Sequence, residues 1–303
     1  MASRWTPQQR ARQRQREKLI IRALLAAAAS SVLVTIGIIG TLLYESAEFF
    51  RHVSLRLFLT DTVWTPLFAE PRYGILPLLT GTLVSTLVAL LVAAPLGLTA
   101  ALYLSEFAAP RVRESIKPAL EMLSGVPTVV YGFFALTLIT PLLQKTILPN
   151  LPGFNILSAG IVIGIMILPY IASLGEDAMR AVPQTLRDGS LALGATKFET
   201  AVHVVLPAAA SGIAAAFVLA LSRAVGETMV VAIAAGQQPN LTLDPREPAA
   251  TITAFIVQVA LGDLPHGSIG YQSIFAAGLV LFLMTLGFNV LAFWLRRRYR
   301  EAY

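Results

Sequence analysis

Residues Ala208–Ala235 read AAASGIAAAFVLALSRAVGETMVVAIAA, and Arg223 and Glu227 are the only charged side chains among them. A continuous helix of this length extends about 42 Å at about 1.5 Å per residue, more than the hydrocarbon core of a bilayer requires. We therefore predict one membrane span with Arg223 near its middle. A charge there costs at least about 2.5–3.5 kcal/mol on insertion scales and is retained only where it faces a partner, a cavity or a pathway.

The composition of the whole chain is that of a protein with several membrane spans. Of 303 residues, 56% are hydrophobic and 13% are charged, whereas soluble domains carry about 25% charged residues. Six apolar segments are long enough to cross a membrane: Leu19–Tyr44, Gly74–Leu104, Pro118–Leu143, Ile156–Leu174, Ala208–Ala235 and Ser273–Leu295. Because the bilayer core offers no water to the backbone, each span is predicted to be helical, which gives an all-α polytopic membrane protein with six transmembrane helices.

Basic residues predict the orientation of these spans. With the N-terminus inside, 17 of the 23 Lys and Arg residues lie in inside segments, 5 lie in outside segments and Arg223 lies within a span. This bias predicts that both termini are cytoplasmic, and it accounts for the net charge of +6 without nucleic acid. We expect a basic cytoplasmic N-terminus over residues 1–18 and one transmembrane domain over residues 19–303. The apolar run Leu19–Leu43 is longer than a signal-peptide core of about 7–15 residues, so we expect a retained anchor.

Two outside segments are long. Glu45–Tyr73 contains several aromatic residues and is expected to form a structured or interfacial cap. Gly236–Gln272 contains the apolar stretch Ala250–Leu261, which is too short to span and is expected to lie along the surface or to re-enter the membrane.

The inside loop Gly175–Pro207 is the second informative region. We predict a short helix from about Val182, a turn at Gly194 with a positive φ angle, and a second helix from about Lys197. Pro207 is then suited to the first turn of the next span. Two short helices at a membrane face form a rigid knob.

This loop resembles the cytoplasmic signature of bacterial ABC importer permeases. That signature is Glu-Ala-Ala, three residues, Gly, nine residues, Ile, one residue and Leu-Pro. Gly194, Val204, Leu206 and Pro207 fall at its spacing, and Asp188-Gly189-Ser190 stand where Glu-Ala-Ala is usual. The resemblance implies a type I ABC importer permease domain whose loop at about 175–207 docks into an ATPase subunit. The residues to which it assigns this coupling role are Asp188, Gly194, Ala195, Thr196, Leu206 and Pro207. The alternative is an ordinary loop between spans.

Further segments resemble phosphate importer permeases in particular. These are Ser222–Met229, Gly194–Thr200, Gly125–Gly132 and Gly74–Thr82, the last preceded by Trp64-Thr-Pro66. Met229 after Gly-Glu-Thr, together with Trp64-x-Pro66, favours the PstC subunit over PstA. The resemblance implies a PstA-like permease partner, two ATPase subunits and an extracytoplasmic phosphate-binding protein in a bacterial inner membrane, and it implies transport by alternating access.

Arg223 and Glu227 carry the predicted chemistry. Their four-residue spacing places them on one face of a helix. The planar arginine fork binds two phosphate oxygens, and a carboxylate accepts a hydrogen bond from a protonated phosphate oxygen but repels fully ionised sulfate. We predict a substrate pathway or gate at Arg223, Glu227 and Thr228; the alternative is a purely structural pair. Weaker candidates for lining the path are the hydroxyls of Thr82, Ser85, Thr128 and Tyr131, although such groups more often bond their own backbone or a neighbouring helix.

Several motifs are absent. The sequence has no Gly-Lys dipeptide and so no phosphate-binding loop of the Gly-x4-Gly-Lys kind, no His-Glu-x2-His, no Gly-x-Ser-x-Gly and no cysteine. We expect no enzyme activity in this chain, with ATP and Mg on the partner ATPase. Competing hypotheses are a permease for molybdate or sulfate, an ion-coupled secondary transporter with Glu227 as a proton relay, and an intramembrane enzyme, for which no nucleophile or metal pattern exists.

Overall fold

The computed structural model describes residues 7–298, and side chains from Arg16 to Trp294. The ends of the two predicted cytoplasmic tails, residues 1–6 and 299–303, lie outside the described residues. The described part contains helices and one isolated β-bridge, between Trp64 and Tyr73. The helices are α1 (Pro7–His52), α2 (Leu55–Thr60), α3 (Leu76–Leu102), α4 (Pro110–Ser124), α5 (Thr128–Phe134), α6 (Thr140–Thr146), α7 (Ile156–Arg180), α8 (Gln184–Ala192), α9 (Lys197–Thr200), α10 (Leu206–Ala208), α11 (Ala210–Val225), α12 (Met229–Ala234), α13 (Ile252–Ala260) and α14 (Ile269–Arg298), with π-helical turns η1 (Tyr103–Phe107), η2 (Ala135–Ile139) and η3 (Ala201–Val205).

The prediction of an all-α protein with several spans is confirmed. Five helical units of the described chain are long and apolar enough to cross a membrane. They are Arg16–His52, Leu76–Phe107, Thr128–Thr146, Ile156–Arg180 and Ile269–Trp294. A sixth candidate is the pair Lys197–Ala208 and Ala210–Val225, whose two parts meet at an angle of 70°. The number six therefore depends on a bent span, whereas the sequence pattern predicted a separate helix from about Lys197 and a span over Ala208–Ala235.

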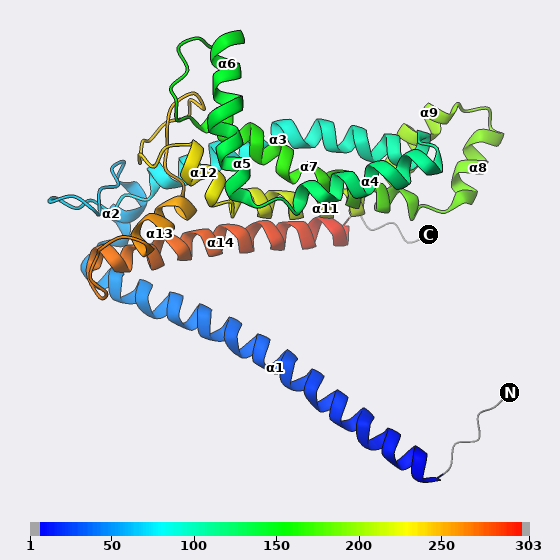
Figure 1. Cartoon of the computed structure of the whole chain (residues 1–303), viewed down its shortest axis with the longest axis horizontal. Coiled ribbons are helices and arrows are strands. Elements are labelled where there is room, and N and C mark those ends of the chain that lie inside the picture. Colours follow the sequence, from blue (N-terminus) through cyan, green and yellow to red (C-terminus); the bar gives the residue numbers. More distant parts are fainter. Residues whose placement is uncertain (1–6, 299–303) are drawn as a thin grey trace.

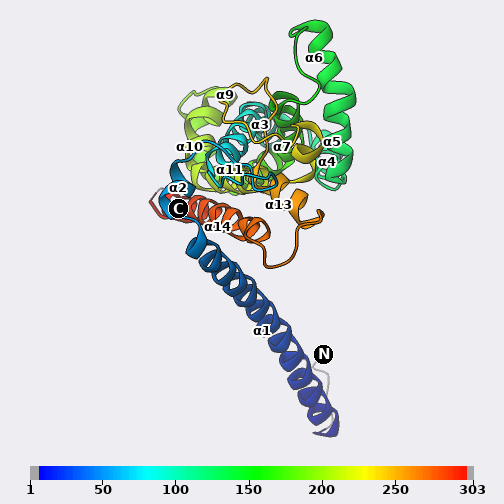
Figure 2. The ribbon, with the colours of Figure 1, turned by 90° about the vertical axis from the view of Figure 1, so that its left-hand side faces the viewer.

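The long helices form a bundle with distinct ends. In Figure 1, α3, α7, α11 and α14 run side by side, with α8 and α9 at one end and α2 and α13 at the other. Helix α1 begins, and α14 ends, toward the α8–α9 end of the bundle. Figures 1 and 2 both show α1 and α6 projecting from the bundle in opposite directions. Much of α1 is exposed and apolar, so in water this helix would be unstable without a lipid or protein cover.

Helices α3 and α7 pack closely because glycines remove side chains from their contact. A Cβ atom on Gly160 would lie 2.6 Å from Cβ of Val88, and one on Gly164 would lie 2.8 Å from the carbonyl oxygen of Ala89. Small residues of this kind allow helix backbones to approach one another where no hydrophobic effect drives association. The resulting core surrounds α7, most of whose residues are buried.

The prediction of a single third span over Pro118–Leu143 is wrong. Helix α4 ends at Ser124, and α5 starts at Thr128 after Gly125-Val126-Pro127. Pro127 has no N–H group to donate within a helix, and it excludes the residue before it from helical geometry. Helix α4 has no buried residue, whereas the continuous unit α5–η2–α6 forms the candidate span.

The aromatic residues of the outside segment form the expected structured cap. Phe49, Phe58, Trp64, Tyr73 and Phe255 contact one another edge to face, with ring centroids 5.0–6.2 Å apart. Helix α1 continues to His52, so Phe49 belongs to this helix and not to the loop that we predicted from Glu45.

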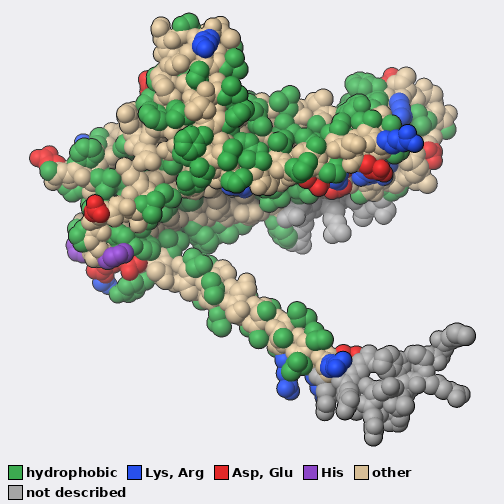
Figure 3. All heavy atoms as spheres, in the orientation of Figure 1, with side chains coloured by type: hydrophobic (Ala, Val, Ile, Leu, Met, Phe, Trp, Pro, Cys, Tyr) green, Lys and Arg blue, Asp and Glu red, His purple; other side chains and the backbone are tan. Residues whose placement is uncertain are grey.

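The short apolar segment predicted at Ala250–Leu261 forms α13, which packs inward. Its residues Ile252, Ala254 and Phe255 are buried, and the N–H of Ile252 donates to Oγ1 of Thr82 in α3, at 3.1 Å. The segment is thus packed into the bundle, and its expected place along the surface or re-entering the membrane stays a prediction. Figure 3 shows charged side chains gathered over the α8–α9 end, with mainly apolar and neutral surface along the bundle.

We predict that Gly160→Ala destabilises the α3–α7 contact. The added methyl group overlaps with Val88, and overpacking of this kind costs about 1–3 kcal/mol. Thermal unfolding of the purified protein in detergent measures the effect as a lower Tm. Gly37→Ala is the matched control, because a Cβ atom there has no neighbour within 4 Å. Equal Tm values for the two variants would contradict the close-packing role of Gly160.

Candidate functional site

The predicted fifth span is interrupted beside Arg223. Helix α11 ends at Val225, and α12 begins at Met229, so the predicted continuous helix Ala208–Ala235 is wrong. Polar groups satisfy the backbone at the break. The N–H of Val230 donates to Oε1 of Glu227 at 3.3 Å, and Oγ1 of Thr253 donates to the carbonyl oxygen of Glu227 at 2.6 Å. Irregular backbone inside an apolar bundle is stable only with such partners.

Arg223, near the end of α11, pairs with Glu227, which lies within this break. Nη1 of Arg223 lies 2.9 Å from Oε2 of Glu227, although Glu227 lies beyond the end of α11, and so not on one helix face as predicted. The Glu227 side chain is 2% exposed and the Arg223 side chain 36%. The contact is an ion pair without hydrogen-bond alignment, since Oε2 has no hydrogen-bond partner among the described residues. The pair thus combines a partly open guanidinium with an acceptor oxygen that has capacity left.

The candidate residues of α5 lie against α12. A Cβ atom on Gly132 would lie 2.9 Å from Cδ1 of Ile233, which shows how closely the two helices approach. The hydroxyl of Tyr131 donates to the carbonyl oxygen of Leu123 at 2.6 Å, so it ties α5 to the end of α4. Thr128 is half-buried at the start of α5. Thr228 is half-buried within the α11–α12 break, where its hydroxyl donates to the carbonyl oxygen of Gly226.

The candidate hydroxyls of α3 are turned to backbone groups. Thr82 and Ser85 are buried and donate to the carbonyl oxygens of Leu78 and Thr82, at 2.8 and 3.0 Å. Thr82 also accepts the N–H of Ile252 and thereby holds α13 in the bundle. The structure does not bring these two hydroxyls to the Arg223–Glu227 pair through any hydrogen bond, and their place in a pathway stays a prediction.

The predicted knob is formed by α8, a turn and α9. Gly194 has φ +89°, and Thr196 forms a reciprocal capping box with Glu199 at the start of α9. The backbone hydrogen bond from Thr196 lowers the pKa of Glu199. Both helices and the turn thus follow the sequence pattern, because glycine tolerates a positive φ and a Thr-x-x-Glu sequence satisfies the first N–H groups of a helix.

The surface of this knob exposes large apolar side chains among charged ones. Leu193 is 90% exposed and Phe198 is 61% exposed. Asp188 is exposed too and accepts a hydrogen bond from Gln184, while Ala195 donates its N–H to the carbonyl oxygen of Ser190. Exposed apolar residues grouped in this way mark an interaction surface.

Leu206 and Pro207 lie in α10, whose end forms a bend. The prediction that Pro207 opens the next span is wrong: α10 ends at Ala208, and the helix direction changes by 70° before α11. Likewise, the predicted loop start at Gly175 is too early, because α7 continues to Arg180. The knob therefore spans residues 181–208 and joins α7 to α11 without an extended connection.

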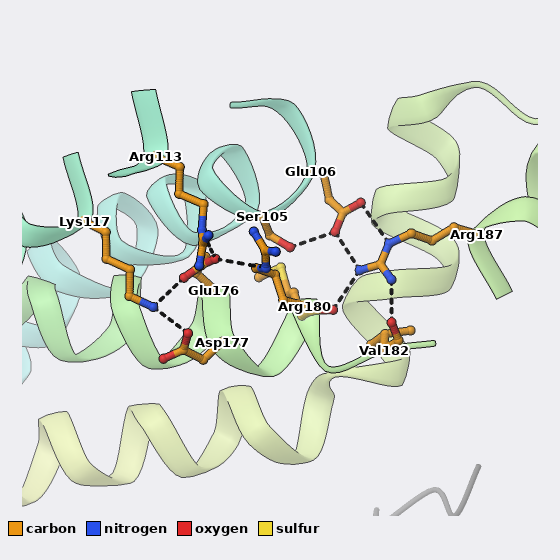
Figure 4. Close-up of polar contacts among 10 residues, drawn as sticks. Ser105, Glu106, Arg113, Lys117, Glu176, Asp177, Arg180, Val182 and Arg187 are labelled. Carbon is orange, nitrogen blue, oxygen red and sulfur yellow. Dashed lines mark hydrogen bonds and ion pairs between the residues drawn. The ribbon is translucent and has the colours of Figure 1, made fainter. Parts of the chain in front are cut away.

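A second polar cluster was missed in the sequence. Glu176 is fully buried near the α8–α9 end of α7 and receives Arg113 and Lys117 of α4, at 2.6 and 2.7 Å (Figure 4). Burial opposes the charged form of Lys117, but hydrogen bonds to Asp177 and Glu176 outweigh it and raise the pKa of Lys117. The residues are about 60 positions apart, so no spacing pattern announces them. The only signal is a carboxylate at the end of an otherwise apolar stretch.

A third pair connects the knob to α3. Arg187 of α8 is buried and contacts Glu106 of η1, with Nη2 and Oε1 3.0 Å apart. Among the described residues there is no group of three His, Asp or Glu side chains placed to hold a metal ion.

Comparison with known proteins identifies the family. Residues 93–301 match the family described as binding-protein-dependent transport system inner membrane component. The chain belongs to this family. It is thus a multi-pass inner-membrane component of a binding-protein-dependent transport system, as the knob signature implied.

The matches to individual relatives also include residues on the N-terminal side of residue 93. The probable ABC transporter permease protein YqgH of Bacillus subtilis is 34% identical, over 93% of this chain and 91% of the relative. The phosphate transport system permease protein PstC of Mesorhizobium japonicum is 33% identical, over 88% of this chain and 86% of the relative. A bacterial alginate ABC transporter, solved in complex with a periplasmic protein, has the same fold, with a TM-score of 0.66 at 16% identity over 94% of this chain and 96% of its own. The predicted importer permease fold is confirmed.

We predict that Gly194→Leu separates ATP hydrolysis from transport in the assembled complex. A leucine at φ +89° forces the turn between α8 and α9 to rearrange, which displaces Leu193 and Phe198. The measurement is substrate imported per ATP hydrolysed in proteoliposomes. Gly267→Leu is the matched control, since Gly267 also has a positive φ angle, +83°, and open space at its Cβ position, but lies between α13 and α14, away from the knob. Unchanged coupling in Gly194→Leu would contradict a docking role for the turn.

Proposed function

We propose that this chain is the PstC-like permease subunit of an ATP-driven importer of inorganic phosphate. The observation that carries the proposal is the Arg223–Glu227 pair, a partly exposed guanidinium held by a buried carboxylate at a break between two helices. The relative from Mesorhizobium japonicum is named a phosphate transport system permease protein, and its match covers 88% of this chain, including Arg223 and Glu227. This supports the substrate class.

The pair accounts for selectivity among tetrahedral anions. The exposed donors of Arg223 bind phosphate oxygens in bidentate fashion. Phosphate at neutral pH retains a proton in a large fraction of molecules, and that O–H donates to Oε2 of Glu227, which has unused acceptor capacity. Sulfate carries no proton at this pH, so the buried carboxylate repels it. The ion pair must open for passage, and a weak site of this kind favours release over retention.

Each end of the bundle has a proposed partner: an ATPase subunit at the knob and a phosphate-binding protein at the aromatic cap. The apolar side chains of Leu193 and Phe198 on the knob suit a groove on one of two ATPase subunits. The second ATPase subunit contacts a PstA-like permease. ATP and Mg bind the ATPases. An extracytoplasmic phosphate-binding protein delivers the anion to the aromatic cap. The excess of basic residues at the knob end and at both termini supports a cytoplasmic location for that end.

Two rival functions make different predictions. A molybdate or sulfate permease with the same fold would bind its anion at Arg223 alone. Phosphate uptake by the reconstituted complex, measured with each anion in excess, separates these cases: we expect inhibition by unlabelled phosphate and not by sulfate or molybdate. An ion-coupled carrier using Glu227 as a proton relay would continue to transport after ATP depletion with the ion gradient held, whereas we expect transport to stop.

We predict that Arg223→Gln abolishes phosphate uptake while the subunits still assemble. The change removes the guanidinium that binds the phosphate oxygens, and it leaves the buried Glu227 carboxylate without a counter-charge. The double variant Arg223→Gln with Glu227→Gln removes that unpaired charge. We expect it to assemble normally and still to lack uptake of radiolabelled phosphate.

The double variant decides between passage and structure. If the pair only joins the two half-helices, neutral glutamines restore transport, and the proposed site is wrong. Arg51→Gln is the control. Arg51 also pairs with a nearby glutamate, Glu48, but it is exposed in the last turn of α1. We expect it to transport at the rate of the unmodified protein.

A further inference from the structure

Arg187 is buried at the base of the knob and uses its whole guanidinium. Nε and Nη2 donate to the two carboxylate oxygens of Glu106 at 3.3 and 3.0 Å, Nη2 also donates to the carbonyl oxygen of Met179 at 2.8 Å, and Nη1 donates to that of Val182 at 2.5 Å. Figure 4 shows Glu106 and Arg187 facing each other, with Val182 beneath the guanidinium. A buried arginine with four such bonds has one geometry available to it.

These bonds join three parts of the fold. Arg187 belongs to α8 of the knob, Met179 and Val182 belong to the end of α7 and the turn after it, and Glu106 belongs to η1 at the end of α3. The last carbonyl groups of a helix have no partner within it, and Arg187 supplies two donors at this place. The carboxylate of Glu106 also accepts the hydroxyl of Ser105 at 2.7 Å, which fixes its orientation. A displacement of α8 therefore pulls on η1 and α7 together.

From Glu106 the connection continues to the candidate site. Helix α4 starts at Pro110, directly after η1, and Glu176 clamps it to α7 through Arg113 and Lys117. The chain then turns at Gly125–Pro127 into α5, which packs on α12 next to the break that holds Glu227. Rigid helices and two ion-paired joints thus connect the knob surface to the Arg223–Glu227 break.

We propose that Arg187 and Glu106 form the positioning pair that transmits movement of the knob to the α3–α4 corner. The proposal deepens the function proposed above, since it rests on an ATP-driven knob, but it does not depend on which anion is carried. Both side chains are about nine-tenths buried, at 11% and 10% exposure, so the pair holds a fixed distance and is not a loosely solvated surface contact. A direct measurement of the movement of α4 tests this coupling.

The experiment follows α4 when ATP is added to the complete complex. The sequence contains no cysteine, so Met122→Cys, 69% exposed on α4, gives this chain a single thiol. We expect ATP to change the rate at which a maleimide labels this thiol. In the Glu106→Ala background we expect the ATP-dependent change to fall by roughly threefold or more. ATP binding by the ATPases should remain.

Control variants make the result specific. Glu48→Ala removes the glutamate of another ion pair with an arginine, on α1 and away from the knob, and should leave the labelling response unchanged. Where Glu106→Ala does not assemble, Glu106→Gln keeps the side-chain size and tests the charge alone. A full ATP response in an assembled Glu106 variant would overturn the proposal.

A second readout separates this proposal from the one on phosphate. Labelling requires ATP but no transported anion, so it tests the pair even if the unmodified complex imports no phosphate, an outcome that defeats only the proposed substrate. In a complex that does import phosphate, we expect Glu106→Ala to lower phosphate imported per ATP hydrolysed. Normal stoichiometry with a normal labelling response would assign Arg187 and Glu106 a purely structural role.

Discussion

Polar groups enclosed in an apolar helical bundle must find their partners within the protein, and this constraint shapes every irregular part of the structure. At the α11–α12 break, Glu227 accepts the N–H of Val230 and Thr253 donates to the Glu227 carbonyl oxygen. The same rule places Thr82 against the N–H of Ile252, which fixes α13 in the bundle. The break is thus held by the side chains of Glu227 and Thr253, and it is where a partly open arginine is stably positioned.

At the α8–α9 end, the cost of burying a charge is offset by ion pairs. Glu176 is fully buried and would be costly alone, but Arg113 and Lys117 surround it, so α4 is fastened to α7 in spite of the absence of buried residues in α4. Breaking such a pair is expensive even though its net contribution to stability is small. Buried pairs are therefore better suited to fixing geometry than to adding stability, which is the property that a moving joint between the knob and the spans requires.

The sequence predicted local features well where their cause is local. The turn at Gly194 needs a residue that tolerates positive φ, and the helix after Thr196 needs a cap that Glu199 supplies, so both appear as expected. Predictions failed where distant residues compete. A run of apolar residues suggested one helix from Ala208 to Ala235. Partners such as Thr253, from a segment expected to lie along the surface or to re-enter the membrane, stabilise a break that hydropathy does not reveal.

The sequence by itself determined that this chain is an all-α membrane protein, where its apolar segments lie, and that a knob with a glycine turn precedes the segment of Arg223. These properties depend on composition and on neighbours within a few residues. Only the tertiary structure decided that the Arg223–Glu227 pair lies at a helix break, that α4 is fastened through Glu176, and that Arg187 is joined to Glu106. The Glu176 and Glu106 contacts arise because helices far apart in the chain bury charges that must then be paired, and no local pattern encodes which partner is reached.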